Sequence, residues 1–338
     1  MKGTDRVVKR KYIKGIIAVI LASAIYGITP IFSNVALQGG LPAEFVHKLF
    51  GNSAEILCAC EERKITNESL IGISMGLACI MSLIVSLVGR KKIRITGKQT
   101  LQLSLFGGGA LAATLLLISY AYLRIPAGLT IVINFTYPVF VLIALSLFFK
   151  EKFTPLRLIP LIMALAGIAL ISSGSFSGKI DPIGVLIAVA SGITYAVYFI
   201  AGKNSAYASL DTSVSNVYIT GSACIIGIIA ALISGRFTLP ADFFMWSLLI
   251  LYSLLGYVIG LRLLLTGIKL LGSVTASALN TLEPLFVFLC SMIVFGETAG
   301  LLEGLGIFLV LASAVIAIIA LRKGDKKTEN KEQAVQKQ

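Results

Sequence analysis

The chain has 338 residues, of which 57% are hydrophobic and 13% are charged, and its formal net charge is +13. Soluble domains carry about 25% charged residues, so this composition excludes that class and predicts a helical protein that crosses the membrane several times. A single His and the lack of a long polar tract also argue against a histidine metal site and a disordered regulator, and no cofactor or metal is expected.

Ten apolar runs predict the membrane-spanning helices, because each is close to the length of about 20 residues that crosses a bilayer. The predicted spans are 15–37, 69–89, 100–122, 127–148, 155–174, 183–202, 212–234, 244–268, 273–294 and 300–321. Four prolines lie at or near predicted helix ends, where a missing N–H group costs least: Pro126, Pro155, Pro182 and Pro240. The predicted fold class is therefore an all-α polytopic membrane protein with a basic N-terminus at 1–14 and a charged tail at 322–338.

The positions of lysine and arginine predict the orientation. With the N-terminus in the cytoplasm, 22 of the 29 basic residues lie in cytoplasmic segments, six lie in external segments and Arg262 lies within the eighth span. This asymmetry follows the positive-inside rule and predicts a multi-pass protein of the cell membrane with both termini in the cytoplasm. The lipid bilayer thereby accounts for the positive charge, and no nucleic-acid partner is expected.

One segment interrupts the pattern between the first and second spans. Residues 38–68 are rich in charged side chains, and the apolar stretch 49–60 is too short to cross the membrane. We therefore expect an external insert at about residues 46–68, whose role the sequence leaves open. Cys58 and Cys60 are separated by a single residue, which matches neither a redox nor a zinc motif, so these thiols are interpreted as unpaired.

The two halves of the chain repeat each other faintly. At a shift of 146 residues, the segment NFTYPVFV at 134–141 lies over NTLEPLFV at 280–287, and Glu151 lies over Glu297. At a shift of 169 residues the first helices also agree: Gly15, Tyr26 and Ile31 lie over Gly184, Tyr195 and Ile200. Each half holds five spans, and an odd number inserts the second half in the opposite orientation. Inverted five-helix repeats are typical of transporters that work by alternating access.

An aromatic residue followed by a small one marks the first helix of each half, at Tyr26-Gly27 and Tyr195-Ala196. The most specific motif is Leu282-Glu283-Pro284-Leu285-Phe286, followed by Phe295-Gly296-Glu297. With repeats at 15–174 and 183–321, most of residues 14–322 resembles the drug/metabolite transporter superfamily, EamA type. The insert departs from that family's pattern, which usually has a short loop and an Arg-Phe-like pair at this place. The resemblance implies the export of amino acids or related metabolites.

Glu283 is the candidate for the central functional residue. It is the eleventh of 22 residues in the span 273–294 and so lies near the bilayer centre. A carboxylate there is costly unless it is paired, hydrated or protonated. We interpret Glu283 as a group that contacts the substrate or accepts a proton in a central cavity, which leaves proton coupling open. The alternative is a protonated structural acid that is bonded to a neighbouring helix.

Asn280 and Pro284 extend the polar group around Glu283. Asn280 lies three residues earlier on the same helix face, and Pro284 cannot donate a hydrogen bond to its carbonyl, so one turn presents a carbonyl, an amide and a carboxylate. The fourth span repeats this arrangement at three equivalent positions: Asn134, Tyr137 and Pro138. The two groups are at the same depth and are predicted to face each other. The alternative is two proline kinks that local Asn hydrogen bonds stabilise.

Tyr26 and Tyr195 add hydroxyl-bearing rings at mid-span, which suit the wall of an amphipathic cavity. The leading hypothesis is a secondary transporter that exports a small polar or amphipathic metabolite, such as an amino acid, by alternating access around this cavity. The sequence contains no nucleotide-binding motif, so the energy would come from a gradient or from none.

Two alternatives from other functional classes stay open. One is a membrane-embedded accessory or sensor protein whose external insert binds a partner. The other is an enzyme that acts on a lipid-linked substrate, for which the sequence offers His47 in the insert and Glu283 as candidate catalytic groups. The sequence predicts neither the identity of the small-molecule substrate nor the oligomeric state.

Overall fold

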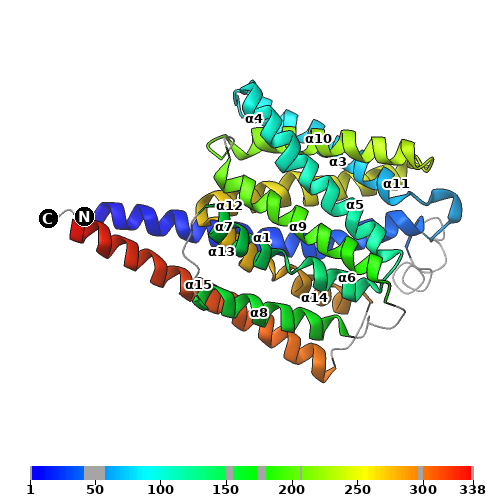
Figure 1. The fold of residues 1–338 in the computed structure, drawn as a ribbon. Coiled ribbons are helices and arrows are strands. Elements are labelled where there is room, and N and C mark those ends of the chain that lie inside the picture. The colour runs from blue at the N-terminus through cyan, green and yellow to red at the C-terminus, as the bar shows by residue number, and fades with distance from the viewer. Residues whose placement is uncertain are drawn as a thin grey trace.

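The computed structural model describes residues 2–41, 58–149, 155–173, 180–205, 208–295 and 300–335. Nine helical segments among these residues are long and apolar enough to cross a membrane, and one further apolar helix is shorter. Figure 1 shows a bundle of helices with both chain ends on the same side; we call this side the terminal end and the opposite side the loop end. The predicted all-α polytopic fold is confirmed.

The helices are, in chain order, α1 (Lys2–Gln38), α3 (Asn67–Val88), α4 (Gly97–Gln102), α5 (Ala110–Tyr122), α6 (Ala127–Asn134), α7 (Tyr137–Phe148), α8 (Pro155–Ile171), α9 (Pro182–Asn204), α10 (Thr212–Ile233), α11 (Phe243–Tyr252), α12 (Leu261–Leu271), α13 (Ser273–Asn280), α14 (Glu283–Phe295) and α15 (Leu301–Val335). A π-helical segment, Leu103–Gly109, joins α4 to α5, and a second, Ser253–Gly260, joins α11 to α12. The third and eighth spans, which are equivalent in the two halves, therefore share this distortion.

Three predicted boundaries are corrected. α1 begins at Lys2, so the basic N-terminal segment 1–14 continues the first span as helix. α15 runs to Val335 and so includes most of the tail predicted at 322–338. Lysine, arginine and glutamate are good helix formers, so a helix continues beyond the apolar run that a hydropathy window detects. In the opposite direction, α8 ends at Ile171, which makes the fifth span shorter than the predicted 155–174.

The fourth and ninth spans are each broken in the middle. A turn at 135–136 separates α6 from α7, and a turn at 281–282 separates α13 from α14. The prediction of one continuous helix in each place is wrong, because Pro138 and Pro284 cannot donate to the carbonyl one turn earlier. At each break a threonine hydroxyl, of Thr136 or Thr281, donates to the carbonyl three residues back at 2.7 Å. The two breaks are 146 residues apart, which is the shift of the predicted repeat.

The two halves interlock with approximate two-fold symmetry. α1 packs on α12 and α14, and its counterpart α9 packs on α5, α6 and α7, while α3 pairs with its equivalent α10 and α8 with α15. Gly15 of α1 lies so close to Leu271 that an added Cβ would be 2.8 Å from Cδ2. Gly184 of α9 lies equally close to Ile125, whose Cγ2 would be 2.8 Å away. Ile125 and Leu271 are themselves 146 residues apart, as expected for inverted five-helix repeats.

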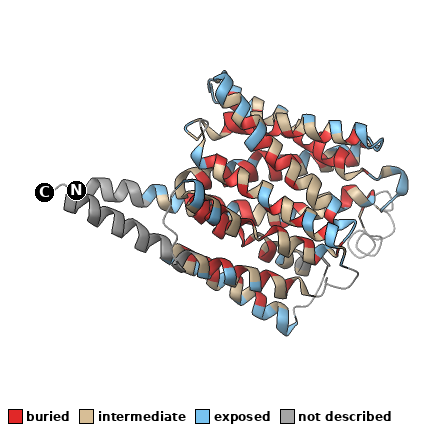
Figure 2. Cartoon of the chain, viewed as in Figure 1, coloured by how far each residue is buried: buried red, intermediate tan, exposed pale blue. Residues whose placement is uncertain are grey.

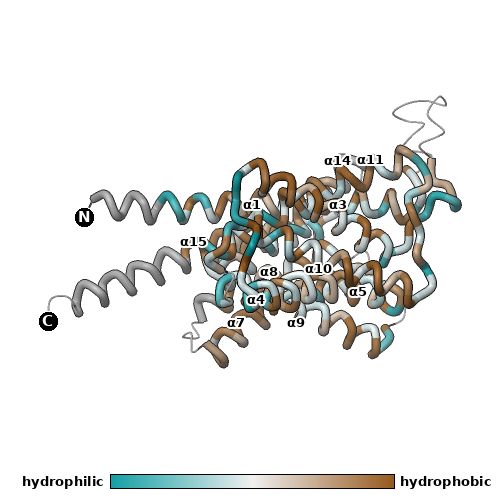
Figure 3. Tube along the Cα trace, turned by 90° about the horizontal axis from the view of Figure 1, so that it is seen from above, coloured by the Kyte–Doolittle hydropathy of each residue, from teal (hydrophilic) through white to brown (hydrophobic). Residues whose placement is uncertain are grey.

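Apolar side chains fill the space between the helices and also cover the outside of the bundle. Figure 2 shows buried residues where the helices meet, and Figure 3 shows hydrophilic residues gathered towards the two ends. On one face of α3, Ile80, Ile84 and Val88 are exposed by 59%, 54% and 80%. Such continuous apolar exposure suits contact with lipid, and the protein is a multi-pass membrane protein.

Hydrogen bonds tie the start of α3 to the loop between α10 and α11. The hydroxyl of Thr66, which caps α3, donates to the carbonyl of Arg236 at 2.7 Å. The N–H group of Thr238 donates to the hydroxyl of Ser69 at 2.9 Å. These bonds join the second and seventh spans at the loop end and hold the first turn of α3 in a fixed position.

The insert predicted at about 46–68 is corrected at its C-terminal end. α3 begins at Asn67, so Glu68 belongs to the second membrane-spanning helix. Just before it, Arg63 forms an ion pair with Asp242 of the α10–α11 loop, with 2.8 Å between Nε and Oδ2. Cys58 and Cys60 are free thiols, as interpreted, and residues 46–57 lie outside the described residues.

Candidate functional site

Asn280, at the end of α13, is the centre of a polar cluster between the two halves. Its Nδ2 donates to the hydroxyl of Tyr137 at 3.2 Å and to Oε2 of Glu283 at 3.1 Å. Its Oδ1 accepts a hydrogen bond from the hydroxyl of Ser23 on α1 at 3.3 Å. The Tyr137 hydroxyl in turn donates to the carbonyl of Ser277 at 3.2 Å. We call these five residues the central cluster; they connect α1, α7, α13 and α14.

Glu283 occupies the first position of α14, directly after the helix break. The N–H groups at a helix N-terminus and the helix dipole favour negative charge at this position. Tyr137 and Asn280 are fully buried, whereas Glu283 is partly exposed. Sequence spacing predicted that Asn280 and Glu283 share a face, and they are hydrogen-bonded even though the helix does not continue between them. A carboxylate at the break of a spanning helix can bind a cationic group or a proton.

Asn134, the counterpart of Asn280, has a different partner. Its Nδ2 donates to the hydroxyl of Ser191 on α9 at 2.9 Å, and the side chain is 95% buried. This bond mirrors the one between Asn280 and Ser23, because in both halves the fourth span contacts the first helix of the other half. Of the two polar groups that the sequence predicts to face each other, Tyr137 reaches the central cluster, whereas Asn134 bonds to α9.

Aromatic rings from α9 extend the central cluster. The ring of Tyr137 lies 4.5 Å from that of Tyr195 and 5.0 Å from that of Phe199, measured between centroids. Tyr198 lies 6.1 Å from Tyr195 between ring centroids and is fully buried, so it is a core residue. Tyr195 is thereby linked to Glu283 through Tyr137 and Asn280.

Tyr26 approaches the cluster from α1. It interacts electrostatically with Glu283 and Tyr137, and its ring lies against Gly260, where an added Cβ would be 3.0 Å from Cε1. The next residue, Gly27, lies directly against Phe286 of α14. The aromatic-glycine element that marks the first helix thus places one ring near Glu283 and lets α1 touch α14.

Sequence reasoning did not predict four residues of this region, which are three serines and one phenylalanine. Ser23, Ser191, Ser277 and Phe199 are buried and contact predicted site residues. Serine is common in apolar helices and gives no signal by itself. The one available signal is that Ser23 and Ser191 lie 168 residues apart, one residue from the shift of 169 that aligns the first helices. The predicted pair Glu151 and Glu297 lies outside the described residues.

Replacing Asn280 with alanine is expected to lower the free energy of unfolding by about 1–2 kcal/mol, because the hydroxyl of Ser23 and the carboxylate of Glu283 lose a buried partner. Reversible unfolding in detergent micelles measures this difference. The control is Asn204→Ala at the exposed end of α9, which should change stability by less than about 0.5 kcal/mol. Equal effects of both substitutions would contradict a structural role for the central cluster.

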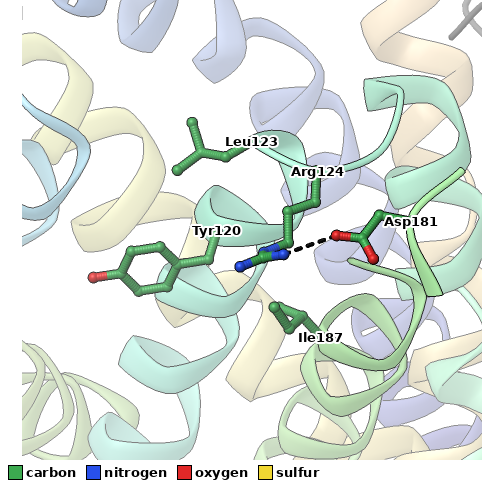
Figure 4. Close-up of a pocket in the computed structure, with 5 residues that line it drawn as sticks. All are labelled: Tyr120, Leu123, Arg124, Asp181 and Ile187. Atoms are coloured by element: carbon green, nitrogen blue, oxygen red, sulfur yellow. Dashed lines mark hydrogen bonds and ion pairs between the residues drawn. The ribbon is translucent and has the colours of Figure 1, made fainter. Parts of the chain in front are cut away.

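Two cavities open at the loop end. One of about 550 Å³ is lined by Tyr120, Leu123, Arg124, Asp181 and Ile187 (Figure 4). The other, of about 400 Å³, shares Tyr120 and Leu123 with it and extends along the start of α3. No residue of the central cluster lines either of these cavities. A cavity at the bilayer centre therefore stays a prediction. Within the described residues, no group of three His, Cys, Asp or Glu side chains is placed to hold a metal ion.

An ion pair bridges the first cavity between α5 and α9. Arg124 Nη1 lies 2.8 Å from Oδ2 of Asp181, and Asp181 Oδ1 caps α9 by accepting from the N–H group of Ile183 at 2.9 Å (Figure 4). The hydrogen bond from Arg124, followed by that from Ile183, lowers the pKa of the Asp181 carboxyl below its usual value. The pair therefore favours the folded state while Asp181 is ionised.

Asp181→Asn is expected to lower the Tm at neutral pH and to reduce its pH dependence. The folded wild-type protein holds the Asp181 carboxyl deprotonated more strongly than the unfolded chain does, so this contribution is present above the usual carboxyl pKa of about 4 and is lost as pH falls through the lowered value. Melting curves of both proteins should converge at acid pH. The exposed acid Glu62 supplies the control, Glu62→Gln, and a constant Tm difference for Asp181→Asn at all pH values would contradict the explanation.

Comparison with known proteins assigns the fold to a family. The EamA-like transporter family matches residues 61–173 and 182–319. These two blocks correspond to the two halves, and the gap between them lies at the predicted repeat boundary; α1 precedes the first block. A solved crystal structure of another protein shares the fold with a TM-score of 0.71 at 13% identity, over 93% of this chain and 98% of that chain.

Two bacterial relatives support the assignment. The protein named "Uncharacterized transporter YvbV" of Bacillus subtilis (strain 168) is 30% identical over 210 residues, which are 60% of this chain and 66%, just under two thirds, of that relative. An "Uncharacterized transporter" of Clostridium kluyveri is 22% identical over 271 residues, covering 76% of this chain and 85% of that protein. With the family match over both halves, this chain belongs to the EamA-like transporter family.

Proposed function

We propose that the protein is a secondary transporter that exports a small polar or amphipathic metabolite, such as an amino acid, across the cytoplasmic membrane. The observation that carries this proposal is the position of Glu283 at a helix break in the ninth span, linked through Asn280 to Tyr137 of the other half. Broken helices that present polar groups at the membrane centre are typical substrate sites of inverted-repeat transporters. Membership of a transporter family favours this function over an enzyme on lipid-linked substrates or an accessory protein.

The bonds of the central cluster suggest how the halves would alternate. Tyr137 belongs to the first half, and Ser277, Asn280 and Glu283 belong to the second. Rocking one half against the other separates Tyr137 from Asn280 and Ser277 and frees their polar groups. Glu283 could then accept a substrate ammonium group or a proton, while the amide of Asn280 and the hydroxyl of Tyr137 donate to a substrate carboxylate. The aromatic rings around Tyr195 would contact the apolar part of the substrate.

The orientation proposed from the charges places the terminal end in the cytoplasm. The loop between α3 and α4 at that end carries Lys91, which pairs with Asp211 before α10 at 3.0 Å. The loop end would then face outwards, and its two cavities would open to the outside. This orientation rests on the 22 basic residues in the segments that the sequence predicts to be cytoplasmic.

Transport in proteoliposomes tests the proposal. Vesicles with the purified protein are loaded with each of the twenty common radiolabelled amino acids in turn, and efflux is followed with and without an imposed pH gradient. At least one amino acid should leave faster than from protein-free vesicles. Absence of transport for all twenty, from protein that is monodisperse and helical by circular dichroism, would contradict the proposed substrate class.

A further inference from the structure

Glu68 is a second acid within a spanning helix, and the central cluster does not involve it. It is the second residue of α3 and is only 5% exposed. Its Oε1 accepts a hydrogen bond from the hydroxyl of Tyr120 at 3.3 Å. A buried carboxylate with one neutral partner is costly, because the remaining lone pairs lose the water that would solvate them. Among the described residues, the Tyr120 hydroxyl is the side chain that donates to the Glu68 carboxylate, whose other acceptor positions can take hydrogen bonds from a bound cationic group.

The cavity of about 400 Å³ lies beside this carboxylate. Glu68 and Tyr120 line it, and Figure 4 shows that the Tyr120 hydroxyl points away from the Arg124–Asp181 pair of the neighbouring cavity. Small-molecule binding sites usually have volumes of about 300–1,000 Å³, and the volume of this cavity lies within that range. The cavity thus has room for a small ligand at the acceptor group.

Positive charge also lines this cavity. Arg236 is an exposed residue of its lining and interacts electrostatically with Tyr120. Lys64 also lines the cavity, but its ammonium group is paired with Glu61. The carbonyl of Arg236 is held by Thr66, so the residue's backbone is fixed relative to α3. Besides the paired Glu61 and Lys64, the carboxylate of Glu68 and the guanidinium of Arg236 therefore lie on a single cavity.

The rest of the lining combines apolar and polar side chains. Leu37 from α1, Ile65 before α3 and Leu123 after α5 contribute aliphatic surface, and Tyr120 contributes its ring. Thr66, Asn67 and Ser119 add polar groups that can bond to the charged ends of a ligand. A ligand with a charged head of both signs and a small apolar body would match this arrangement. A purely anionic ligand would meet the carboxylate of Glu68, and a purely cationic one would meet Arg236.

We propose that this cavity is a binding site for a small zwitterion, with the ammonium group at Glu68 and Tyr120 and the carboxylate group at Arg236. It is separate from the central cluster and lies at the loop end of the bundle. Its role as an outer station on the transport route rests on the proposed function, whereas the binding itself does not.

Binding to the Glu283→Gln protein tests the proposal, because this variant removes the acid of the central cluster and leaves the loop-end cavity intact. Each of the twenty common amino acids is titrated into the purified protein in detergent, and the Tm is recorded. The best ligand is then compared with its amide, which lacks the carboxylate, and its N-acetyl derivative, which lacks the ammonium group. Saturable stabilisation by the zwitterion and at least about tenfold weaker binding of both derivatives are expected.

Further variants in the same background locate the site. Adding Glu68→Gln or Arg236→Gln should weaken binding of the zwitterion about tenfold or more, and Tyr120→Phe should weaken it less. The matched control is Glu62→Gln, an exposed acid six residues earlier that lies outside the cavity lining. If Glu68→Gln does not fold, Arg236→Gln carries the test.

Two results would overturn the inference. One is no saturable binding of any amino acid to Glu283→Gln, and the other is an affinity that neither Arg236→Gln nor Glu68→Gln changes relative to Glu283→Gln alone. Failure of the proposed function looks different, because proteoliposomes would then show no amino-acid transport while Glu283→Gln still binds the zwitterion through Glu68. Transport by the wild-type protein without binding to Glu283→Gln would instead support the central site and reject the second one.

Discussion

Replacing Glu283 with glutamine is expected to reduce the initial rate of transport in proteoliposomes by about 10-fold to 100-fold. Glutamine has the same shape and can still accept the hydrogen bond from Asn280, so the fold should be retained. The substitution removes the negative charge at the start of α14, and a hydrogen bond to a charged group is worth about 1.5–3 kcal/mol. That free energy corresponds to the expected loss of rate when the substrate carries an ammonium group.

Glu303→Gln supplies the matched control for Glu283→Gln. Glu303 lies in the first turn of α15 and is also partly exposed, but it lies outside the central cluster. Its substitution should leave the transport rate within about twofold of the wild type, since surface substitutions rarely exceed about 0.5 kcal/mol. A wild-type rate for Glu283→Gln, or equal losses for both variants, would remove Glu283 from the mechanism.

The pH dependence of the same two proteins separates the two proposed roles of Glu283. If this residue carries a proton, the rate of the wild-type protein changes with an imposed pH gradient, and the rate of Glu283→Gln does not. If it only contacts the substrate, both proteins respond to the gradient alike and differ in apparent KM. Initial rates at several substrate concentrations and two gradients distinguish these outcomes.

The membrane-spanning helices could be read from the sequence because runs without charge are long and regular. Their interruptions could not, since hydropathy windows do not respond to backbone geometry. The two breaks at 135–136 and 281–282 depend on a proline and a threonine close together, and either residue alone is tolerated in a spanning helix. The repeat held the relevant information, because the proline recurs at the shift of 146 residues and the threonine recurs one residue away from that shift.

The candidate site was predictable to the extent that it is local in sequence. Asn280 and Glu283 are three residues apart, and their hydrogen bond is local in sequence, although a turn at 281–282 and not a shared helix face brings them together. The bonds of Asn134 to Ser191 and of Ser23 to Asn280 span 57 and 257 residues and depend on how the halves pack. The sequence predicts Glu68 in the external insert because its charge ends the apolar run, whereas in the structure it is buried in α3 and accepts a hydrogen bond from Tyr120 of another helix.

Replacing Gly27 with alanine is expected to lower the free energy of unfolding by about 1–3 kcal/mol, the usual cost of overpacking a close contact. A Cβ at this position would lie 2.3 Å from the Cβ of Phe286 and 2.7 Å from its carbonyl carbon. Because one of these atoms belongs to the backbone, a side-chain rotation cannot relieve the clash, and α1 must move away from α14.

The same displacement should reduce transport, which distinguishes Gly27→Ala from a purely structural defect. Phe286 lies three residues after Glu283, and Ser23 lies one turn before Gly27 on α1, so separation of the two helices stretches the bond between Ser23 and Asn280. Gly304→Ala on α15 is the matched control: no atom lies within 4 Å of the added Cβ, and alanine stabilises a helix by about 0.5–1 kcal/mol relative to glycine. Gly27→Ala should therefore lower both the free energy of unfolding in detergent and the transport rate in proteoliposomes. Gly304→Ala should raise the free energy of unfolding slightly and leave the transport rate unchanged. Equal stability of the two variants would show that α1 and α14 are not in contact at this position.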